Sequence, residues 1–193
     1  MNKRATKYTA DDIEILEDLS PILHRPGMYT DPVNPNHALV EVIDNASDEG
    51  LAGYAKNAEI KLYEDGSAEV IDDGRGIPVD IHRTKKIPAI QVIFTTLHSG
   101  GKFRKTDSES VYRIAGGLHG VGVCVSNALS TKLEAEVTRD GVVHQIIFGP
   151  NGKVQVPLKK LKEVARNKTG TRIRFWPDAK YFDSVKFDIV ALT

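Results

Sequence analysis

The chain has 193 residues, which is about the size of one domain and enough to bury a hydrophobic core. Its 26 basic and 26 acidic residues balance, so the whole chain carries no electrostatic footprint for nucleic acid or an anionic membrane. A single cysteine, Cys124, excludes an internal disulfide framework, and no apolar stretch is typical of a signal peptide or a membrane span. We therefore expect a cytoplasmic domain that contacts no membrane, with any DNA contact outside this chain.

The first half of the chain predicts two helices and a hairpin. Apolar residues at helical spacing predict a short amphipathic helix over residues 10–23 and a longer one over residues 37–52. Between them, prolines and a glycine interrupt regular structure. Residues 58–72 predict two strands joined by a tight turn at Asp65-Gly66.

The second half predicts two more helices and then strands. Apolar residues spaced i, i+3, i+4 and i+7 predict a helix over 88–98, and another follows the glycines over 121–129. Residues 99–116 are polar and contain glycine, which predicts a mobile loop. Helices early and antiparallel strands late predict an α+β two-layer sandwich, with helices on one face of a mixed, mostly antiparallel sheet. The late strands are expected at 132–138, 142–148, 153–156 and 171–176.

Four glycines fall within the seven residues 116–122, directly before a predicted helix. Free N–H groups and the positive dipole end make a helix N-terminus an anion site, so phosphate is the natural ligand. The segment is no Walker loop, because no Gly-Lys-Ser/Thr follows, and no dinucleotide fingerprint, because Val125 replaces the third glycine. Taken alone, a flexible hinge before a helix explains the glycines equally well.

The helix predicted over 37–52 carries a polar stripe formed by His37, Glu41, Asn45 and Asp48. Five acid or amide groups lie within residues 41–49. Such groups are costly to bury unless they hold a cation or one another, which makes Mg²⁺ bound by oxygen ligands plausible. The alternative is a solvated helix face.

Asp72 ends a half-apolar strand, and the glycines that follow it free the backbone to approach a ligand. A buried carboxylate there is able to accept a hydrogen bond from an exocyclic amine such as that of adenine, although an ordinary turn explains the pattern equally well. Cys124 and the remaining histidines show no metal-ligand spacing. We interpret one cationic group as a solvated face: Lys159, Lys160, Lys162, Arg166 and Lys168.

Together and in this order, the three clusters resemble the motifs of the GHKL ATPases. The nucleotide site of that family, the Bergerat fold, is shared by type II DNA topoisomerases, mismatch-repair ATPases, heat-shock chaperones and histidine kinases. Over residues 8–182 the chain is similar to the B-type subunits of bacterial gyrase and topoisomerase IV. The motifs that carry the resemblance are 25–29, 41–45, 72–78, 97–103, 116–122, 169–171 and 175–177.

The segment 28–31 with Pro35-Asn36-His37 is more similar to topoisomerase IV than to gyrase, which usually reads Met-Tyr-Ile-Gly at the first of these places. The resemblance implies ATP-driven strand passage, relaxation and decatenation of DNA, or negative supercoiling if the relative is gyrase. It also implies a homodimer that forms on ATP, with DNA and the A-type subunit of the topoisomerase contacted through other regions. A non-hydrolysing nucleotide-binding module or a histidine kinase is the alternative, although no phosphoacceptor-helix segment is present.

The resemblance assigns catalytic and metal-binding roles on the polar helix. Glu41 would be the general base that takes a proton from the attacking water, and His37 would orient it. Asn45 would bind the Mg²⁺ that bridges the phosphates. Asp72 would accept from the adenine amino group, with Thr171 completing that polar end.

Further residues would complete the ATP site by resemblance. Arg75, paired with Glu49, would border the adenine pocket; Lys102 would approach the phosphates from a lid over 99–116, and Tyr8 would reach the partner's nucleotide. Aminocoumarin inhibitors would contact Asp72, Arg75, Thr171 and also Arg139. Gly76, Ile77, Pro78 and Ile93 would surround the base, and Gly117, Leu118, His119, Gly120, Val121, Gly122 and Val123 would surround the phosphates.

The chain ends in an apolar segment, 187–193, without a polar tail. We therefore expect residues 1–193 to be a single ATP-binding domain from the N-terminal part of a longer protein. Relatives supply a lysine for the γ-phosphate from a following transducer domain. Without that lysine, the chain is expected to bind ATP but to turn it over poorly.

Overall fold

The computed structural model describes residues 17–97, 99 and 122–190. Its helical elements are the α-helices α1 (Ser20–His24), α2 (Asn36–Leu51), α3 (Ala89–Thr95) and α4 (Gly122–Ala128), with the 3₁₀ turns η2 (Pro26–Met28) and η4 (Pro150–Gly152). Its strands are β1 (Ala58–Leu62), β2 (Ala68–Asp72), β3 (Ser130–Arg139), β4 (Val142–Phe148), β5 (Val154–Glu163) and β6 (Gly170–Pro177).

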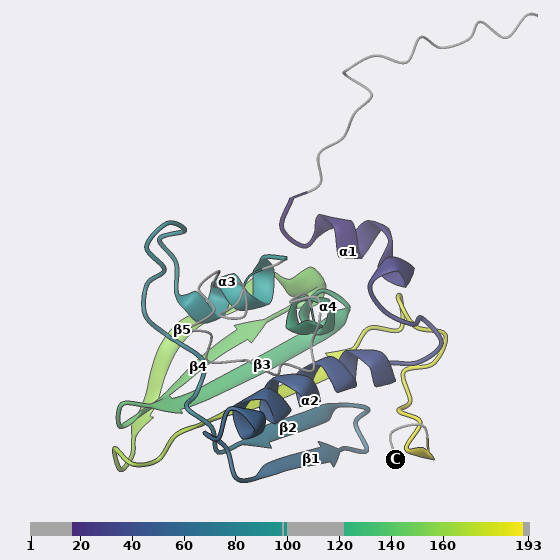
Figure 1. The fold of residues 1–193 in the computed structure, drawn as a ribbon. Helices are drawn as coiled ribbons and strands as arrows, with labels where there is room; N and C mark the ends of the chain where they lie inside the picture. Colours follow the sequence, from purple (N-terminus) through teal and green to yellow (C-terminus); the bar gives the residue numbers. More distant parts are fainter. Residues whose placement is uncertain (1–16, 98, 100–121, 191–193) are drawn as a thin grey trace, which may run out of the picture.

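The six strands form one sheet in the order β1-β2-β6-β3-β4-β5. The last strand in sequence, β6, lies between β2 and β3, and it is antiparallel to both. Figure 1 shows the helices gathered over one face of this sheet, with α2 and α4 side by side. The predicted α+β two-layer sandwich is confirmed. One detail differs, because every pairing between the described strands is antiparallel rather than mixed.

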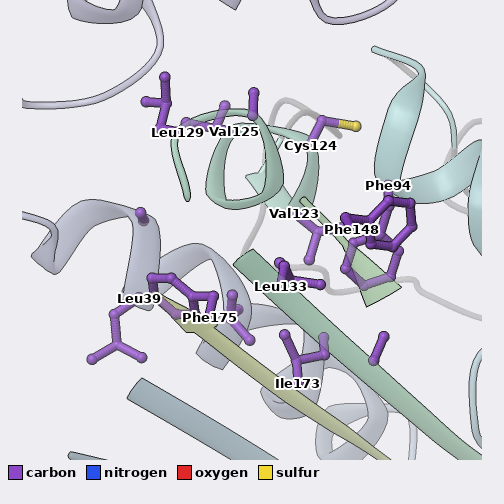
Figure 2. Close-up of a cluster of buried hydrophobic side chains, with 14 of the residues drawn as sticks. Leu39, Phe94, Val123, Cys124, Val125, Leu129, Leu133, Phe148, Ile173 and Phe175 are labelled. Carbon is purple, nitrogen blue, oxygen red and sulfur yellow. The ribbon is translucent and has the colours of Figure 1, made fainter. Parts of the chain in front are cut away.

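The hydrophobic core lies between the helix layer and the sheet, as Figure 2 shows. The Phe94 ring of α3 stacks on that of Phe148 of β4, with ring centroids 5.3 Å apart. Helix α2 buries Ala38, Leu39, Val42 and Ala46, which follow one another at helical spacing, and this places its polar stripe at the edge of the core. Because α2 also contacts β2 and α4, the elements predicted to carry the site are adjacent.

Most of the predicted elements are present within one to three residues of the expected bounds. Two differ from the structure. The helix expected over 10–23 does not continue through Asp18, where the backbone has a φ of 53° and turns, so α1 begins only at Ser20. The strand expected over 153–156 continues as β5 to Glu163, because its hydrogen bonds to β4 persist through a lysine-rich half that has no apolar alternation.

Candidate functional site

Asp72 lies at the end of β2, directly opposite Thr171 of β6. Its carboxylate accepts a hydrogen bond from the N–H of Gly74 at 2.8 Å. Burial raises the pKa of Asp72 to about 6, and the Glu49 carboxylate adds to the rise, against the lowering effect of the Gly74 and Thr171 N–H groups. The side chain therefore has acceptor capacity that the protein itself satisfies only in part.

A bidentate ion pair joins α2 to the turn after β2. The Arg75 Nη2 and Nε atoms donate to the two oxygens of Glu49 at 2.7 and 3.1 Å, and the Arg75 N–H donates to the same carboxylate at 3.0 Å. The guanidinium carbon lies 3.7 Å from the centre of the Tyr54 ring. The three hydrogen bonds from Arg75 to the Glu49 carboxylate hold the 72–76 turn against α2.

The turn after β2 also packs tightly against the neighbouring strands. Gly76 has a φ of +76°, and a Cβ added there would lie 2.9 Å from the carbonyl oxygen of Thr138, so only glycine fits. Arg139, at the end of β3, donates from Nη1 to the Gly76 carbonyl at 3.2 Å. The structure thus brings Asp72, Gly76, Arg139 and Thr171 to one end of the sheet, although the sequence separates them widely.

The polar stripe of α2 faces the start of α4. His37 Nε2 lies 3.8 Å from Glu41 Oε1, and the Asn45 amide nitrogen donates to the Glu41 backbone carbonyl at 2.8 Å. A Cβ added at Gly122 would overlap the Glu41 carboxylate, so the first residue of α4 lies directly against that side chain. The predicted general base and the end of the predicted phosphate loop are therefore neighbours.

A metal ion held by protein side chains alone does not fit this stripe. Among the residues that the structure describes, no group of three or more His, Cys, Asp or Glu side chains is placed to hold a metal. Asn45 commits its amide nitrogen to its own helix, which leaves the amide oxygen as the atom to present to a cation. Mg²⁺ commonly takes one or two protein oxygens and completes its shell with phosphate and water, and Asn45 suits that arrangement.

The remaining predicted residues divide into three groups. Ile77 and Ile93 are half-buried against the core, Pro78 is exposed, and Val123 is buried in α4. Cys124 is buried, and its Sγ lies 3.0 and 3.2 Å from the carbonyls of Ile93 and Thr96, so it is a packing residue. Predictions for Tyr8, Lys102, Gly117, Leu118, His119, Gly120 and Val121 lie outside the described residues.

Two residues at the site were not found in the sequence. Tyr54, which stacks on Arg75, follows α2 in a segment without any motif, so no signal marked it. Ser126 donates from Oγ to the Ala38 carbonyl at 2.7 Å and ties α4 to α2. Its place among the apolar residues of the helix predicted over 121–129 was the available signal, since a hydroxyl that such a helix buries needs a partner. Within the described part of the chain, no helix has the length and apolarity that crossing a bilayer requires.

Comparison with known proteins places this arrangement in a family. Residues 30–181 match the family described as histidine kinase-, DNA gyrase B- and HSP90-like ATPases. The B-type subunit of DNA topoisomerase 4 from Francisella tularensis is 54% identical over 185 residues, which is 96% of this chain and 29% of that protein. Its Escherichia coli counterpart is 50% identical over 186 residues, again 96% of this chain and 29% of the relative. The B-type subunit of DNA gyrase from Thermus thermophilus is 47% identical over 184 residues, 94% of this chain and 28% of the relative.

Solved structures agree with the sequence relatives. The topoisomerase IV ATP-binding domain of Francisella tularensis, in complex with a small-molecule inhibitor, superimposes with a TM-score of 0.79 at 49% identity, covering 92% of this chain and 46% of that one. The 43K ATPase domain of Thermus thermophilus gyrase B, in complex with an aminocoumarin, gives 0.76 at 41% identity, covering 90% and 43%. The chain spans less than a third of the length of its curated relatives. Because the family model covers most of the chain and these structures share its fold, the chain belongs to the histidine kinase-, DNA gyrase B- and HSP90-like ATPase family.

Proposed function

We propose that residues 1–193 are the ATP-binding and ATP-hydrolysing domain of a bacterial type II DNA topoisomerase, and that the whole protein is the B-type subunit of topoisomerase IV rather than that of gyrase. The observation that carries the proposal is the Asp72–Thr171 pair at the end of the sheet, where a half-buried carboxylate keeps acceptor capacity. The relatives from topoisomerase 4, at 50% identity or more, support the choice over gyrase.

Adenine recognition would rest on the ionised form of Asp72. A carboxylate accepts from the exocyclic amine, whereas guanine presents a carbonyl at the same place and would be rejected. Thr171 is 7% exposed and lies opposite Asp72 on the neighbouring strand, so it would complete the polar end of the pocket. The Glu49–Arg75 pair holds the turn in place, and Ile77 with Ile93 would supply apolar walls.

The triphosphate would lie between α2 and the start of α4. Bound Mg²⁺ would neutralise charge on the phosphates, and the Asn45 amide oxygen would hold it. Glu41 would accept a proton from the attacking water, and His37, 3.8 Å away, would keep the carboxylate oriented. Gly122 permits this approach, because any side chain there would displace Glu41.

The isolated chain would bind ATP with poor turnover, since it spans less than a third of its curated relatives and, by family resemblance, a following transducer domain contributes a lysine to the γ-phosphate. In the whole protein, we propose that two copies close on ATP and capture a DNA segment, with the A-type subunit supplying strand cleavage. A protein that acts on bacterial DNA would work in the cytoplasm. Robust hydrolysis by the isolated chain, absent in a Glu41→Ala preparation that excludes contaminants, would overturn the expectation of poor turnover.

The decisive experiment is a calorimetric titration of the chain with a non-hydrolysable ATP analogue and Mg²⁺, beside Asp72→Asn and the neighbouring Asp73→Asn. We expect binding by the parent and by Asp73→Asn, and a loss of about 10- to 100-fold for Asp72→Asn, since a hydrogen bond to a charged group contributes about 1.5–3 kcal/mol. Equal binding by all three would remove Asp72 from the site. If a folded parent does not bind the analogue, an aminocoumarin titration follows. Aminocoumarin binding would then indicate that the triphosphate needs the transducer domain, and no binding would indicate that the site is wrongly assigned.

Glu41→Ala distinguishes an enzyme from a nucleotide-binding module. In the full-length protein with its A-type partner, hydrolysis should fall by roughly 10²- to 10⁴-fold while analogue binding by this chain is retained. Glu64→Ala, an exposed residue of the β1–β2 turn, is the matched control. Unchanged hydrolysis in Glu41→Ala would exclude its role as the base. Assays of the same complex decide between the two enzymes, because decatenation would indicate topoisomerase IV and negative supercoiling would indicate gyrase.

Arg139 offers a test of inhibitor binding at the same site. Its guanidinium donates to the Gly76 carbonyl, so it borders the turn that would enclose adenine. The aminocoumarin in the related gyrase structure makes this drug class the natural probe. Arg139→His should weaken aminocoumarin binding more than ATP binding, and equal losses would contradict the assignment.

A further inference from the structure

The segment after β6 returns to the loop that precedes α2. The Asp183 N–H donates to the backbone carbonyl of Pro32 at 2.8 Å, and the Ser184 N–H donates to that of Val33 at 3.2 Å. We call residues 183–188 the strap, and Figure 1 shows it, in yellow, beside the start of α2. The strap therefore lies next to the first turn of that helix.

Asn36, the first residue of α2, is joined to the strap through both ends of its side-chain amide. Its Nδ2 donates to the backbone carbonyl of Asp188 at 2.7 Å, and its Oδ1 accepts from the N–H of the same residue at 2.9 Å. An asparagine amide presents a donor and an acceptor side by side, so Asn36 pairs with residue 188 as a neighbouring strand would. We call these two hydrogen bonds the clamp, and they join residues that are 152 positions apart in the sequence.

The strap has supports of its own on the body of the domain. The Phe187 ring packs edge-on against that of Phe175, with ring centroids 6.0 Å apart. Just before the strap, Tyr181 is buried, and its hydroxyl donates to the Asn151 amide oxygen at 2.8 Å. These contacts and the two backbone hydrogen bonds to the loop already hold the strap. The effect of the clamp therefore falls mainly on α2.

The first turn of α2 lacks the usual cap. Pro35 occupies the N-cap position and makes no side-chain hydrogen bond to the helix, whereas a serine, threonine or aspartate there would satisfy a free N–H group. The Asn34 amide oxygen accepts from the N–H of Asn36 at 3.0 Å, which partly replaces that cap. The clamp adds a restraint from outside the helix, at an end where helices readily fray.

The clamp also lies next to the residue that would orient the general base. His37 follows Asn36 directly, and its Nε2 lies 3.8 Å from Glu41 Oε1. The His37 side chain is 46% exposed, so packing alone does not fix it, whereas the next two residues, Ala38 and Leu39, are buried in the core. Movement of the first turn would therefore displace His37 and leave the rest of α2 in place.

We propose that Asn36 is a positioning residue for ATP hydrolysis, because its clamp holds the first turn of α2 and thereby keeps His37 against Glu41. The inference rests on the proposed function, in which Glu41 is the general base. Asn45 lies further along α2, and Asp72 lies on β2, so nucleotide binding does not depend on the clamp. Loss of the clamp should thus lower kcat far more than it changes KM.

The alternative is that the clamp only stabilises the fold. A loss of stability would reduce the active fraction of the protein by the same factor whichever residue stands at position 37. A positioning residue behaves differently, because its effect disappears once the group that it positions has been removed. Dependence on His37 therefore separates the two roles.

The test is steady-state ATP hydrolysis by the full-length protein with its A-type partner, in a double-mutant cycle of Asn36→Ala and His37→Ala. Asn167→Ala, which removes an exposed amide from the β5–β6 connection, is the matched control. Binding of the ATP analogue by each complex checks that the domain is folded. Should Asn36→Ala not bind the analogue, Asn36→Asp, whose carboxylate still accepts from the Asp188 N–H, replaces it in the same cycle.

We expect Asn36→Ala to lower kcat by about three- to tenfold, with KM and analogue affinity within about twofold of the parent. In the His37→Ala background the same change should lower kcat by less than about twofold. Asn167→Ala should match the parent. An equal loss of kcat in both backgrounds, a loss confined to KM, or a parent-like kcat in Asn36→Ala would each overturn the proposal.

Glu41→Ala in the same assay keeps this inference separate from the proposed function. If Glu41→Ala hydrolyses ATP as the parent does, the proposed function itself fails, and this inference fails with it. If Glu41→Ala is inactive and Asn36→Ala is unimpaired, the positioning role of Asn36 alone is excluded.

Discussion

Two neighbouring carboxylates at the end of β2 face different regions and behave in opposite ways. Asp72 faces α2, and burial raises its pKa to about 6. Asp73 faces the exposed start of β1, and hydrogen bonds from Asn57 and Lys56 lower its pKa to about 2. One turn therefore contains a carboxylate whose charged form burial disfavours and another whose charged form hydrogen bonds from the chain stabilise.

The largest expected effect is an opposite change in stability at these two positions. Asp72 has a folded pKa above its usual 3.8, so its contribution to stability is present at low pH and is lost as the pH rises through about 4 to 6. Asp72→Asn should therefore increase the free energy of unfolding at pH 7.5, by at most about 3 kcal/mol for a shift of about two pKa units.

Asp73→Asn should instead lower the melting temperature at pH 7.5, because its ionised form accepts three hydrogen bonds. Its contribution is present above pH 4 and is lost as the pH falls towards 2. Thermal denaturation of the ligand-free parent and both variants between pH 3 and 8 measures both effects. A change of the same sign for the two variants would break the comparison.

Nucleotide affinity should follow the ionisation of Asp72. If only the carboxylate accepts from adenine, affinity for the ATP analogue should fall about tenfold between pH 7.5 and pH 5, one unit below a pKa of about 6. Asp73 stays ionised over this range, so Asp73→Asn should keep the same profile. A flat profile in the parent, measured by calorimetry in buffers of matched ionic strength, would contradict this role for Asp72.

Removing Arg75 should sharpen the difference between the two carboxylates. Glu49 is the like charge that helps to raise the pKa of Asp72, and Arg75 neutralises it in part. Arg75→Gln should therefore raise that pKa further and weaken analogue binding by about three- to tenfold at pH 6.5, with a smaller loss at pH 8. Arg83→Gln, at an exposed position, is the control. An equal loss at both pH values would indicate a direct contact with the nucleotide instead.

The smallest effect is expected at Cys124, a buried residue to which we assign no ligand. Burial raises the pKa of this thiol to about 12, so it stays protonated at neutral pH. A serine hydroxyl would donate to the same carbonyls of Ile93 and Thr96. Cys124→Ser should change the free energy of unfolding by less than about 1 kcal/mol in urea denaturation, with ATP-analogue binding unchanged. A loss of nucleotide binding would show that the residue does more than pack.

The fold was predictable where periodicity was long and turns were marked. The apolar residues of α2 repeat over four turns, and the Asp65-Gly66 turn fixes the β1–β2 hairpin, so both predictions were correct. The predicted helix over 10–23 was wrong at Asp18, where the backbone has a positive φ. Three apolar residues at helical spacing give no sign that one residue between them interrupts the helix. The lysine-rich half of β5 was missed, since an edge strand is held by backbone hydrogen bonds that leave no apolar pattern.

The site was less accessible to reasoning from local pattern. Glu41 and Asn45 share a helix face, which spacing alone shows. The pairing of Asp72 with Thr171 depends on a cross-strand register between distant segments, and only the family resemblance anticipated it. The cationic group over 159–168 was visible in the sequence, and the structure exposes its side chains, as expected of a solvated face.

The position of β6 determines when the sheet can be completed during synthesis of the chain. Among the strands that the structure describes, β6 is the last in sequence, and it is the one that joins the β1–β2 hairpin to β3, β4 and β5. A ribosome that has exposed the chain only up to the end of β5 presents the β1–β2 hairpin and the three strands β3, β4 and β5 without the strand that joins them. Asp72 then lies on the hairpin, and β6, which carries Thr171, is still missing. If adenine binds at Asp72 and Thr171 as proposed, nucleotide would stabilise the nascent chain only after residue 177 has emerged, and ATP would act on the finished sheet rather than guide its assembly.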